Sequence, residues 1–372
     1  MRKYDYIVEP LLQWYDANKR VLPWREDTSA YRVWVSEIML QQTRVEAVKP
    51  YFERFIRELP SIGELADAPE DRLLKLWEGL GYYNRVRNMQ KAAVKVMEEF
   101  EGRMPEDYEY LLSLPGIGSY TAGAVASISF QKAVPAVDGN VLRIIARLTM
   151  DGEDVLSQKV KSRVEQEIKS IMPQARPGDF NQALMELGAT VCIPNGEPHC
   201  TECPWESFCE ARRCGCMMDF PVKSGKKART IEKKTVLIIR DNEKTVIRKR
   251  PAKGLLAGMY EFPMLEGYVT EKEVLRYVAG LGYRPIQIQK LEDARHIFSH
   301  KEWHMQGFAI KVEEAAFSDV SDEIGTLEKG MLVTGPRETE EKYPIPTAFS
   351  AYTKYVDIRL GTESFLVDSE LN

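Results

Sequence analysis

Four of the six cysteines in this chain of 372 residues stand within eighteen positions of one another. They are Cys192, Cys200, Cys203 and Cys209, with seven, two and five residues in the gaps between them. In a reducing compartment, thiols bunched at such distances are better explained by metal thiolates than by disulfides. The run therefore predicts a loop, at about residues 192–209, folded around a metal centre.

The spacing of the four cysteines favours one kind of metal centre over another. Structural zinc sites usually draw their ligands as two close pairs, and only Cys200 and Cys203 form such a pair. An iron–sulfur cubane needs four thiolates around one compact object, and a single loop can supply them. We expect the cluster, with zinc and buried free thiols as the alternatives. Cys214 and Cys216 are not needed for this set, although either could substitute as a ligand.

Length and charge limit the remaining possibilities. A chain of this length can hold two cores of ordinary size. It contains no run of eighteen apolar residues and begins without the apolar core of a signal peptide, so we expect a soluble, cytoplasmic protein. The net charge of −5 by itself disfavours a nucleic-acid partner. Any affinity for DNA must therefore come from a local patch.

The pattern of apolar residues changes once along the chain, from helical periodicity to strand-like segments. Up to about residue 190 the apolar periodicity is helical, as in the stripe formed by Val86, Met89, Ala93, Val96, Met97 and Phe100. A basic stretch follows, and then Thr235–Ile239 and Thr245–Ile247 flank a polar turn, which predicts a β-hairpin. We expect an all-α domain over 1–222, a basic linker over 223–234, an α+β domain over 235–362 and a tail over 363–372.

A glycine-rich turn precedes the cysteines. In the segment Leu114-Pro-Gly-Ile-Gly118, Gly116 and Gly118 permit close backbone approach, and the free N–H groups of the helix expected after them would attract a phosphate. Twenty residues after Gly118 comes Asp138. It could be simply the N-cap of the next helix, or it could carry chemistry.

The turn, Asp138 and the four cysteines, in this order, resemble the helix-hairpin-helix DNA glycosylases of the endonuclease III superfamily. Within it the chain is most similar to the adenine DNA glycosylases of the MutY type. The matching stretches are Leu22–Arg25, Ser36–Arg44, Gly79–Tyr83 and Phe298-Ser299-His300. The resemblance implies a helix-hairpin-helix glycosylase domain with a [4Fe-4S] cluster loop, followed by a MutT-like (Nudix-like) α+β domain. The first cysteine gap is seven residues where the family commonly has six.

The resemblance also implies an active site. Glu37 would protonate N7 of adenine, which requires apolar burial to raise its pKa by roughly two pH units from about 4.3. Asp138 would stay ionised and face the sugar, its pKa kept low by helix amides, and would either hold the positive charge of the sugar electrostatically or form a transient covalent ester with it. Tyr120 and Asn140 would support these two carboxylates. Trp24, Arg25 and Gln182 would shape the pocket for the base.

The implied partner is double-stranded DNA with adenine opposite 8-oxoguanine or guanine, bound by a monomer that flips the adenine out of the duplex. Tyr82 would fill the gap as a wedge, while Gln42, Thr43 and Leu80 would contact the opposite base, and Gly116 and Gly118 the DNA backbone. Phe298, Ser299 and His300 would read 8-oxoguanine. A metal-binding helix face made of His296, His300 and His304 is disfavoured, since no carboxylate completes the set and the surroundings are rich in β-structure.

Three other functions fit the sequence less well. Endonuclease III relatives that cut the backbone carry a nucleophilic lysine where this chain has Tyr120, and a hydroxyl cannot form a Schiff base, so we expect a monofunctional enzyme. A Nudix pyrophosphohydrolase needs clustered glutamates for magnesium, and Thr270–Arg276 does not supply them. A non-catalytic scaffold is disfavoured because Glu37 and Asp138 are both present.

Overall fold

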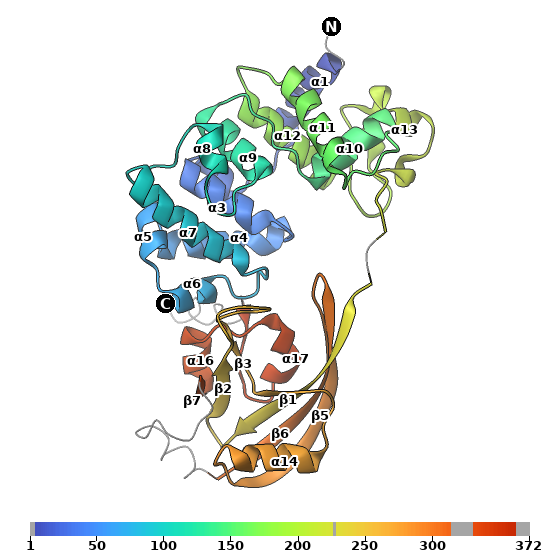
Figure 1. Ribbon diagram of the computed structural model, residues 1–372. Coiled ribbons are helices and arrows are strands. Elements are labelled where there is room, and N and C mark those ends of the chain that lie inside the picture. The colour runs from blue at the N-terminus through green and yellow to red at the C-terminus, as the bar shows by residue number, and fades with distance from the viewer. Residues whose placement is uncertain (1–3, 226–227, 314–329, 362–372) are drawn as a thin grey trace. The chain divides into compact units, whose positions relative to one another are not determined.

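The computed structural model describes residues 4–225, 228–313 and 330–361 (Figure 1). The chain forms two compact units, Met1–Asp67 with Arg87–Lys226, and Ala68–Val86 with Lys227–Asn372. The expected tail, 363–372, lies outside the described residues. Among those that are described, no helix combines the length and apolarity needed to cross a membrane.

Every regular element that the described residues of the first unit form is helical. The helices are α1 (Val8–Asn18), α2 (Pro23–Glu26), α3 (Ala30–Leu40), α4 (Val45–Glu58), α5 (Ile62–Asp67), α7 (Asn84–Glu99, which enters the unit at Arg87), α8 (Tyr108–Leu112), α9 (Ser119–Phe130), α10 (Gly139–Thr149), α11 (Gln158–Ile171), α12 (Pro177–Thr190) and α13 (Glu210–Arg213). The cysteine loop adds short 3-10 turns at Cys200–Glu202 and Glu206–Phe208.

Helix α10 carries one side of this unit's core. Its buried face consists of Val141, Leu142, Ile144, Ile145 and Leu148, which pack with buried residues of α1, α11 and α12. The spacing of three and four residues puts these side chains on one side of the helix. The cysteine loop joins the same core, because Trp205 is buried in it and its indole N–H donates to the carbonyl of Ile7 at 3.0 Å.

The apolar stripe predicted for α7 is only partly buried. Val86, Met89, Ala93 and Val96 are buried as expected, whereas Met97 is 45% exposed. The helix ends at Glu99, and the sulfur of Met97 lies over the turn at Gly102, 3.1 Å from where a β-carbon of that glycine would stand. The periodicity therefore predicts the helix correctly but extends its buried face one turn too far.

The described residues of the second unit form a seven-stranded sheet. Its strands are β1 (Thr230–Arg240), β2 (Thr245–Lys249), β3 (Tyr260–Glu261), β4 (Met264–Glu266), β5 (Pro285–Ile297), β6 (Lys301–Val312) and β7 (Met331–Thr334). The order is β3-β2-β1-β6-β5, with β4 also pairing β1 and β7 also pairing β2. Strands β1 and β6 run parallel, and the other pairs are antiparallel. The hairpin predicted around Asp241 is confirmed, since Arg240 pairs with Thr245.

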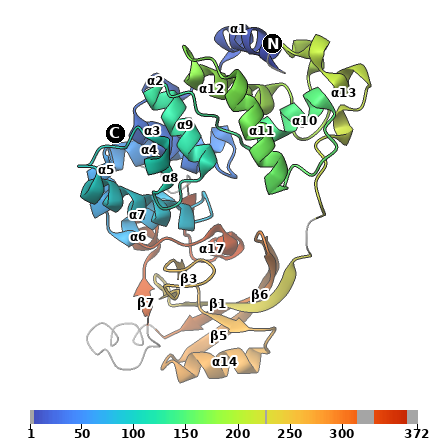
Figure 2. The same cartoon turned by 45° about the horizontal axis from the view of Figure 1, so that its top comes forward.

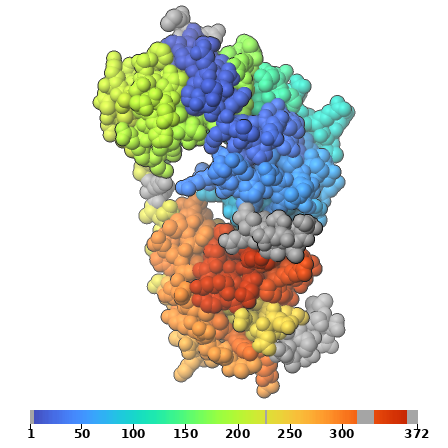
Figure 3. Space-filling view, turned by 180° about the vertical axis from the view of Figure 1, so that it is seen from behind, coloured from blue at the N-terminus to red at the C-terminus, as the bar shows by residue number. Residues whose placement is uncertain are grey.

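Alternate residues of β1 face two separate cores. Leu237 and Ile239 pack with α14 (Glu271–Gly280), whereas Val236 and Ile238 pack with the segment that leads into α17 (Ser350–Thr353). Helices therefore cover both faces of the sheet, as Figure 2 shows. In the space-filling view from behind, the red residues toward the end of the chain lie on the surface of this unit, beside orange residues that precede them in the sequence (Figure 3). The unit is of the α+β class that the sequence predicts.

The second unit is not continuous in sequence. It includes residues 68–86 with helix α6 (Glu70–Leu76), in addition to α16 (Pro336–Lys342) and the sheet. The fully buried carboxylate of Glu78 accepts backbone N–H groups of Ile345 at 2.6 Å and Gly361 at 3.3 Å, and the ammonium group of Lys75 at 2.8 Å. Strand β1 begins at Thr230, within the stretch expected to be linker.

Candidate active site

Glu37 lies on α3 with only 5% of its surface exposed, between buried neighbours such as Ile38 and Met39. The hydroxyl of Tyr120, on α9, donates a hydrogen bond to its Oε2 atom. Burial raises the pKa of Glu37 to about 7; the Tyr120 hydrogen bond opposes this rise and the negative charge of Asp138 adds to it. A protonated carboxyl group is thus available near neutral pH, as the sequence argument requires.

Asp138 is the N-cap of α10. Its Oδ1 atom accepts the backbone N–H groups of Asn140 at 2.9 Å and Val141 at 2.8 Å, and its Oδ2 atom accepts the side-chain amide of Asn140 at 2.7 Å. The simplest interpretation of the sequence, a helix cap, is therefore correct, and it does not exclude a role in chemistry.

The expectation that helix amides keep the pKa of Asp138 low is wrong in its net direction. Burial raises the pKa of this carboxyl group above its ordinary value, and the hydrogen bonds from Val141 and Asn140 only partly oppose that rise. The physical reason is that removing the carboxylate from water outweighs the few donors that face it.

Asn140 is held in turn by Arg143. The guanidinium donates to the side-chain oxygen of Asn140 at 3.0 Å, to the carbonyl of Gly188 at 2.7 Å and to the carbonyl of Cys192 at 3.0 Å. The donors around Asp138 are thus connected to the start of the cysteine loop. Of these residues, Asp138, Asn140 and Cys192 were predicted from the sequence to be functional, whereas Arg143 was not.

The predicted base-pocket residues are brought together by α2 and α12. The Nε atom of Arg25 donates to the side-chain oxygen of Gln182 at 3.1 Å. Trp24 is buried, with its ring edge-to-face against Phe52 at 5.4 Å. The positive charge of Arg25 lowers the pKa of Glu37, which relates this pair to the predicted acid.

Glu186 is a buried residue of this site that the sequence analysis did not identify. It lies on α12 with 1% of its surface exposed, and its carboxylate forms ion pairs with Arg20 at 2.6 Å and Arg25 at 2.7 Å. These bonds lower the pKa of Glu186 against the effect of its burial. The signal was available, since Glu186 follows Gln182 by four residues and so shares its helix face.

Gly116 and Gly118 meet different requirements in the turn before α9. Gly116 has a φ of +78°, and a β-carbon there would stand 2.7 Å from the β-carbon of Asn88. Gly118 is the N-cap of α9, has extended backbone, and faces open space. Only Gly116 is therefore required to be glycine by the fold. Gly118 supplies no side-chain oxygen to the first N–H groups of α9.

The residues assigned to the opposite base lie in two turns. Gln42 follows α3, is exposed and has a φ of +63°, and the N–H of Thr43 donates to the carbonyl of Leu40. Tyr82, in the segment that belongs to the second unit, is 53% exposed with a φ of +48°, whereas Leu80 is buried. The ring of Tyr82, exposed on a residue with left-handed backbone, is compatible with insertion into a DNA duplex.

Arg85 supports the turn that carries Tyr82. Its Nη2 atom donates to the carbonyls of Leu80 and Gly81, each at 3.0 Å, and its guanidinium lies 5.7 Å from the ring centre of Tyr82. The indole N–H of Trp77 donates to the same carbonyl of Gly81 at 3.1 Å. The backbone of the turn is therefore fixed while the tyrosine ring remains exposed.

Phe298, Ser299 and His300 form the turn between β5 and β6. Phe298 packs between His296 and Trp303, with ring centres at 4.6 and 4.9 Å. Ser299 and His300 are exposed, and the serine Oγ atom lies 3.3 Å from Nδ1 of the histidine. His296 is on β5 and His304 on β6, so the three histidines lie on a hairpin and do not form a helix face.

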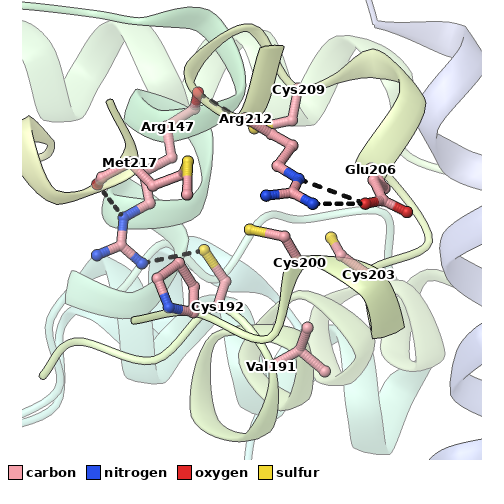
Figure 4. A pocket seen from close by; sticks show the side chains of 10 residues that line it. Arg147, Val191, Cys192, Cys200, Cys203, Glu206, Cys209, Arg212 and Met217 are labelled. Carbon is pink, nitrogen blue, oxygen red and sulfur yellow. Dashed lines mark hydrogen bonds and ion pairs between the residues drawn. The ribbon is translucent and has the colours of Figure 1, made fainter. Parts of the chain in front are cut away.

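All four cysteines of the run line one pocket, and the empty space of about 310 Å³ at this place includes solvent outside it (Figure 4). Arg147 donates to the sulfur of Cys192 at 3.3 Å, and the Cys209 thiol donates to the carbonyl of Arg147 at 3.4 Å. Within the described ranges, no three His, Cys, Asp or Glu side chains gather closely enough to hold a single metal ion. Cys214 and Cys216 do not line the pocket.

Comparisons with known proteins agree with this fold. The model of the HhH-GPD superfamily base excision DNA repair proteins matches residues 35–174, and that of the NUDIX domain matches 235–355. The adenine DNA glycosylase of Mus musculus is 36% identical over 368 residues, which cover 83% of this chain and 71% of the mouse protein. That of Buchnera aphidicola subsp. Acyrthosiphon pisum is 34% identical over 316 residues, covering 84% and 88%.

A solved structure of a thermostable thymine-DNA glycosylase is also similar. It is 25% identical, with a TM-score of 0.50, and the match covers 56% of this chain and 96% of that one. The predicted fold class, a helical glycosylase domain followed by a Nudix-like α+β domain, is confirmed. The chain belongs to the adenine DNA glycosylase family of base excision repair enzymes.

Proposed function

We propose that this protein is a monofunctional DNA glycosylase that removes adenine mispaired with 8-oxoguanine or guanine from double-stranded DNA. The observation that carries this proposal is the pair of carboxyl groups in one site, of which Glu37 has a pKa of about 7 and faces Tyr120. Names of relatives point to adenine as the base that is released.

The reaction divides between the two carboxyl groups. Glu37 gives its proton to N7 of adenine, so that the bond between the sugar C1′ and N9 breaks with its electron pair going to the base. Asp138 stabilises the positive charge that develops on the sugar. Water then attacks C1′ and passes a proton to the Glu37 carboxylate, which restores the acid.

Tyr120 supports the monofunctional assignment. Its hydroxyl already donates to Glu37, and burial raises the pKa of the phenol well above its ordinary value, so it remains a neutral donor. Without an amine at this position, no Schiff base with the abasic sugar forms there. An endonuclease III-like glycosylase with lyase activity is therefore less well supported.

The flipped adenine would enter the pocket made by Trp24, Arg25 and Gln182, where the bond between Arg25 and Gln182 fixes the two polar groups. Tyr82, exposed on its fixed turn, would fill the space left in the duplex, with Leu80, Gln42 and Thr43 near the opposite base. The N–H groups that follow Gly116 and Gly118 would hold a DNA phosphate.

Recognition of 8-oxoguanine is assigned to the turn between β5 and β6. Ser299 and His300 are exposed there and carry groups that both donate and accept hydrogen bonds, while Phe298 anchors the turn. Hydrolysis of nucleotides by this unit is disfavoured. In α14, Glu273 uses its carboxylate to cap the helix at Thr270, which leaves it occupied rather than available for magnesium.

A [4Fe-4S] cluster held by Cys192, Cys200, Cys203 and Cys209 is part of the proposal. The four thiols come from a single loop and line one pocket, and a cubane needs four thiolates around one compact object. Iron binding must displace protons, since burial raises the pKa of the Cys203 thiol to about 12. When bound, the cluster would cross-link the loop beside α10.

The test is single-turnover excision on duplexes with adenine opposite 8-oxoguanine, guanine or thymine, with and without alkali. We expect adenine release opposite 8-oxoguanine and guanine, with strand cleavage only after alkali. Glu37→Gln should bind the same duplexes and release no adenine. Release from none of the duplexes by the wild-type protein, or cleavage without alkali, would contradict the proposal.

A further inference from the structure

The carboxylate of Glu186 is enclosed by donors from one short stretch of chain. Its Oε1 atom accepts the backbone N–H of Arg20 at 3.2 Å and the Nε atom of the same residue at 2.6 Å. Its Oε2 atom accepts Arg20 Nη2 at 3.1 Å and Arg25 Nη2 at 2.7 Å. With 1% exposure, Glu186 is out of reach of DNA, so any role in the reaction must pass through these two arginines.

Arg25 is the residue through which Glu186 reaches the site. While Nη2 of Arg25 is held by Glu186, its Nε donates to Gln182 and its Nη1 donates to the carbonyl of Arg20 at 3.0 Å. The guanidinium also lies 5.6 Å from the ring centre of Tyr15. Four contacts thus fix the plane of the guanidinium.

The charges of this group are balanced only partly. Two guanidinium groups face one carboxylate, which leaves one net positive charge beside the predicted acid. The groups that act on Glu37 are Tyr120 from α9, Asp138 from the cap of α10 and Arg25 from α2. Without the negative charge of Glu186, Arg25 would favour the ionised form of Glu37 more strongly.

We propose that Glu186 is a positioning residue of the glycosylase reaction, which orients Arg25 and Gln182 toward the base and offsets the positive charge with which Arg25 acts on Glu37. This inference rests on the proposed function. Three separate observations support it: the burial of the carboxylate, its four hydrogen bonds, and its place one helical turn after Gln182.

The experiment compares Glu186→Gln with the wild-type protein in single-turnover excision across pH, together with the Kd for the duplex. Glutamine keeps the size of the side chain and removes its charge. We expect an unchanged Kd and an excision rate lower by about tenfold to a hundredfold, the scale of a small displacement of a pocket group. The alkaline limb of the profile should move to lower pH by about half a unit to one unit.

Two further variants separate positioning from a general loss of structure. Glu186→Asp keeps the charge one methylene short, so it should restore the position of the alkaline limb but not the full rate. Asp179→Asn is the matched control on the same helix, since Asp179 is ion-paired with Arg176 at 2.8 Å and Arg176 retains Asp16. It should behave as the wild-type protein.

If the wild-type protein releases no adenine, the proposed function is wrong, and the role of Glu186, which rests on it, is wrong as well. If the wild-type protein is active and Glu186→Gln matches it in rate and pH profile, or Asp179→Asn reproduces the defect, Glu186 has no positioning role. Should Glu186→Gln not fold, Arg20→Gln decides, because it leaves Arg25 and Glu186 as a balanced pair, one positive charge fewer than in the wild-type group, and must move the alkaline limb to higher pH; an unmoved limb would refute the proposal.

Discussion

The hydroxyl of Tyr120 donates a hydrogen bond to the carboxylate of Glu37 from the neighbouring helix. This bond favours the ionised form of Glu37 and therefore opposes the effect of burial on its pKa. Tyr120→Phe removes the bond and leaves the ring. We expect the pKa of Glu37 to rise and the alkaline limb of single-turnover excision to move up by about one pH unit. A limb that stays in place would show that the two groups are not coupled in the complex with DNA.

The buried acid also makes stability depend on pH. Because the folded-state pKa of Glu37, about 7, lies above its ordinary value of 4.5, the unfolded chain ionises first, and stability is lost as pH rises between these values. Glu37→Gln should be more stable than the wild-type protein above pH ~7 by about 3 kcal/mol. Urea unfolding of Glu37→Gln and of the wild-type protein at pH 4 and pH 8 measures the difference in their free energies of unfolding. The same difference at both pH values would contradict the prediction.

The two glycines of the turn before α9 provide a matched pair. Gly116→Ala places a β-carbon against Asn88 on a residue with positive φ, so it should destabilise the protein by about 1–3 kcal/mol. Gly118→Ala meets open space and should cost less than about 1 kcal/mol. Thermal unfolding of both variants is the measurement. Similar losses of stability in Gly116→Ala and Gly118→Ala would show that the turn adjusts its backbone to the new β-carbon.

Ser299→Ala tests the reading of the opposite base. Removing an exposed hydroxyl from the turn between β5 and β6 should leave excision opposite guanine unchanged and reduce excision opposite 8-oxoguanine, which narrows the ratio of the two rates. Ser350→Ala, at an exposed serine of the same unit, is the control. An unchanged ratio removes Ser299 from recognition.

Substitution of a cysteine inside the pocket and of one outside it should have different effects. The purified protein should be yellow-brown, as expected for iron bound by thiolates. Cys200→Ser, in the pocket, should lose this colour and lower the Tm, whereas Cys214→Ser, exposed and outside the pocket, should keep both. A colourless wild-type protein that contains zinc would rule out the cluster, and loss of colour only in Cys214→Ser would reassign the ligand.

The sequence predicted the parts of the fold that depend on local pattern. The hairpin around Asp241 and the helix after Gly118 follow from turn residues and apolar spacing, which act over a few positions. It did not predict the net pKa of Asp138, because burial is produced by the packing of several helices and no local pattern records it. The position of Glu186 on the helix face of Gln182 could be read locally, but its ion pairs could not, since Arg20 and Arg25 are more than 160 residues away in the chain.

The interleaving of the two units has a consequence for any shortened form of the protein. A chain that ends before β1 still contains residues 68–86, with Lys75 and Glu78, but has lost Ile345 and Gly361. It would leave the carboxylate of Glu78, which is fully buried in the intact chain, without these two donors. Deletion of the C-terminal residues would thus leave an incomplete protein, prone to proteolysis or association at α6, and activity measured on such a fragment would not report on the helical unit alone.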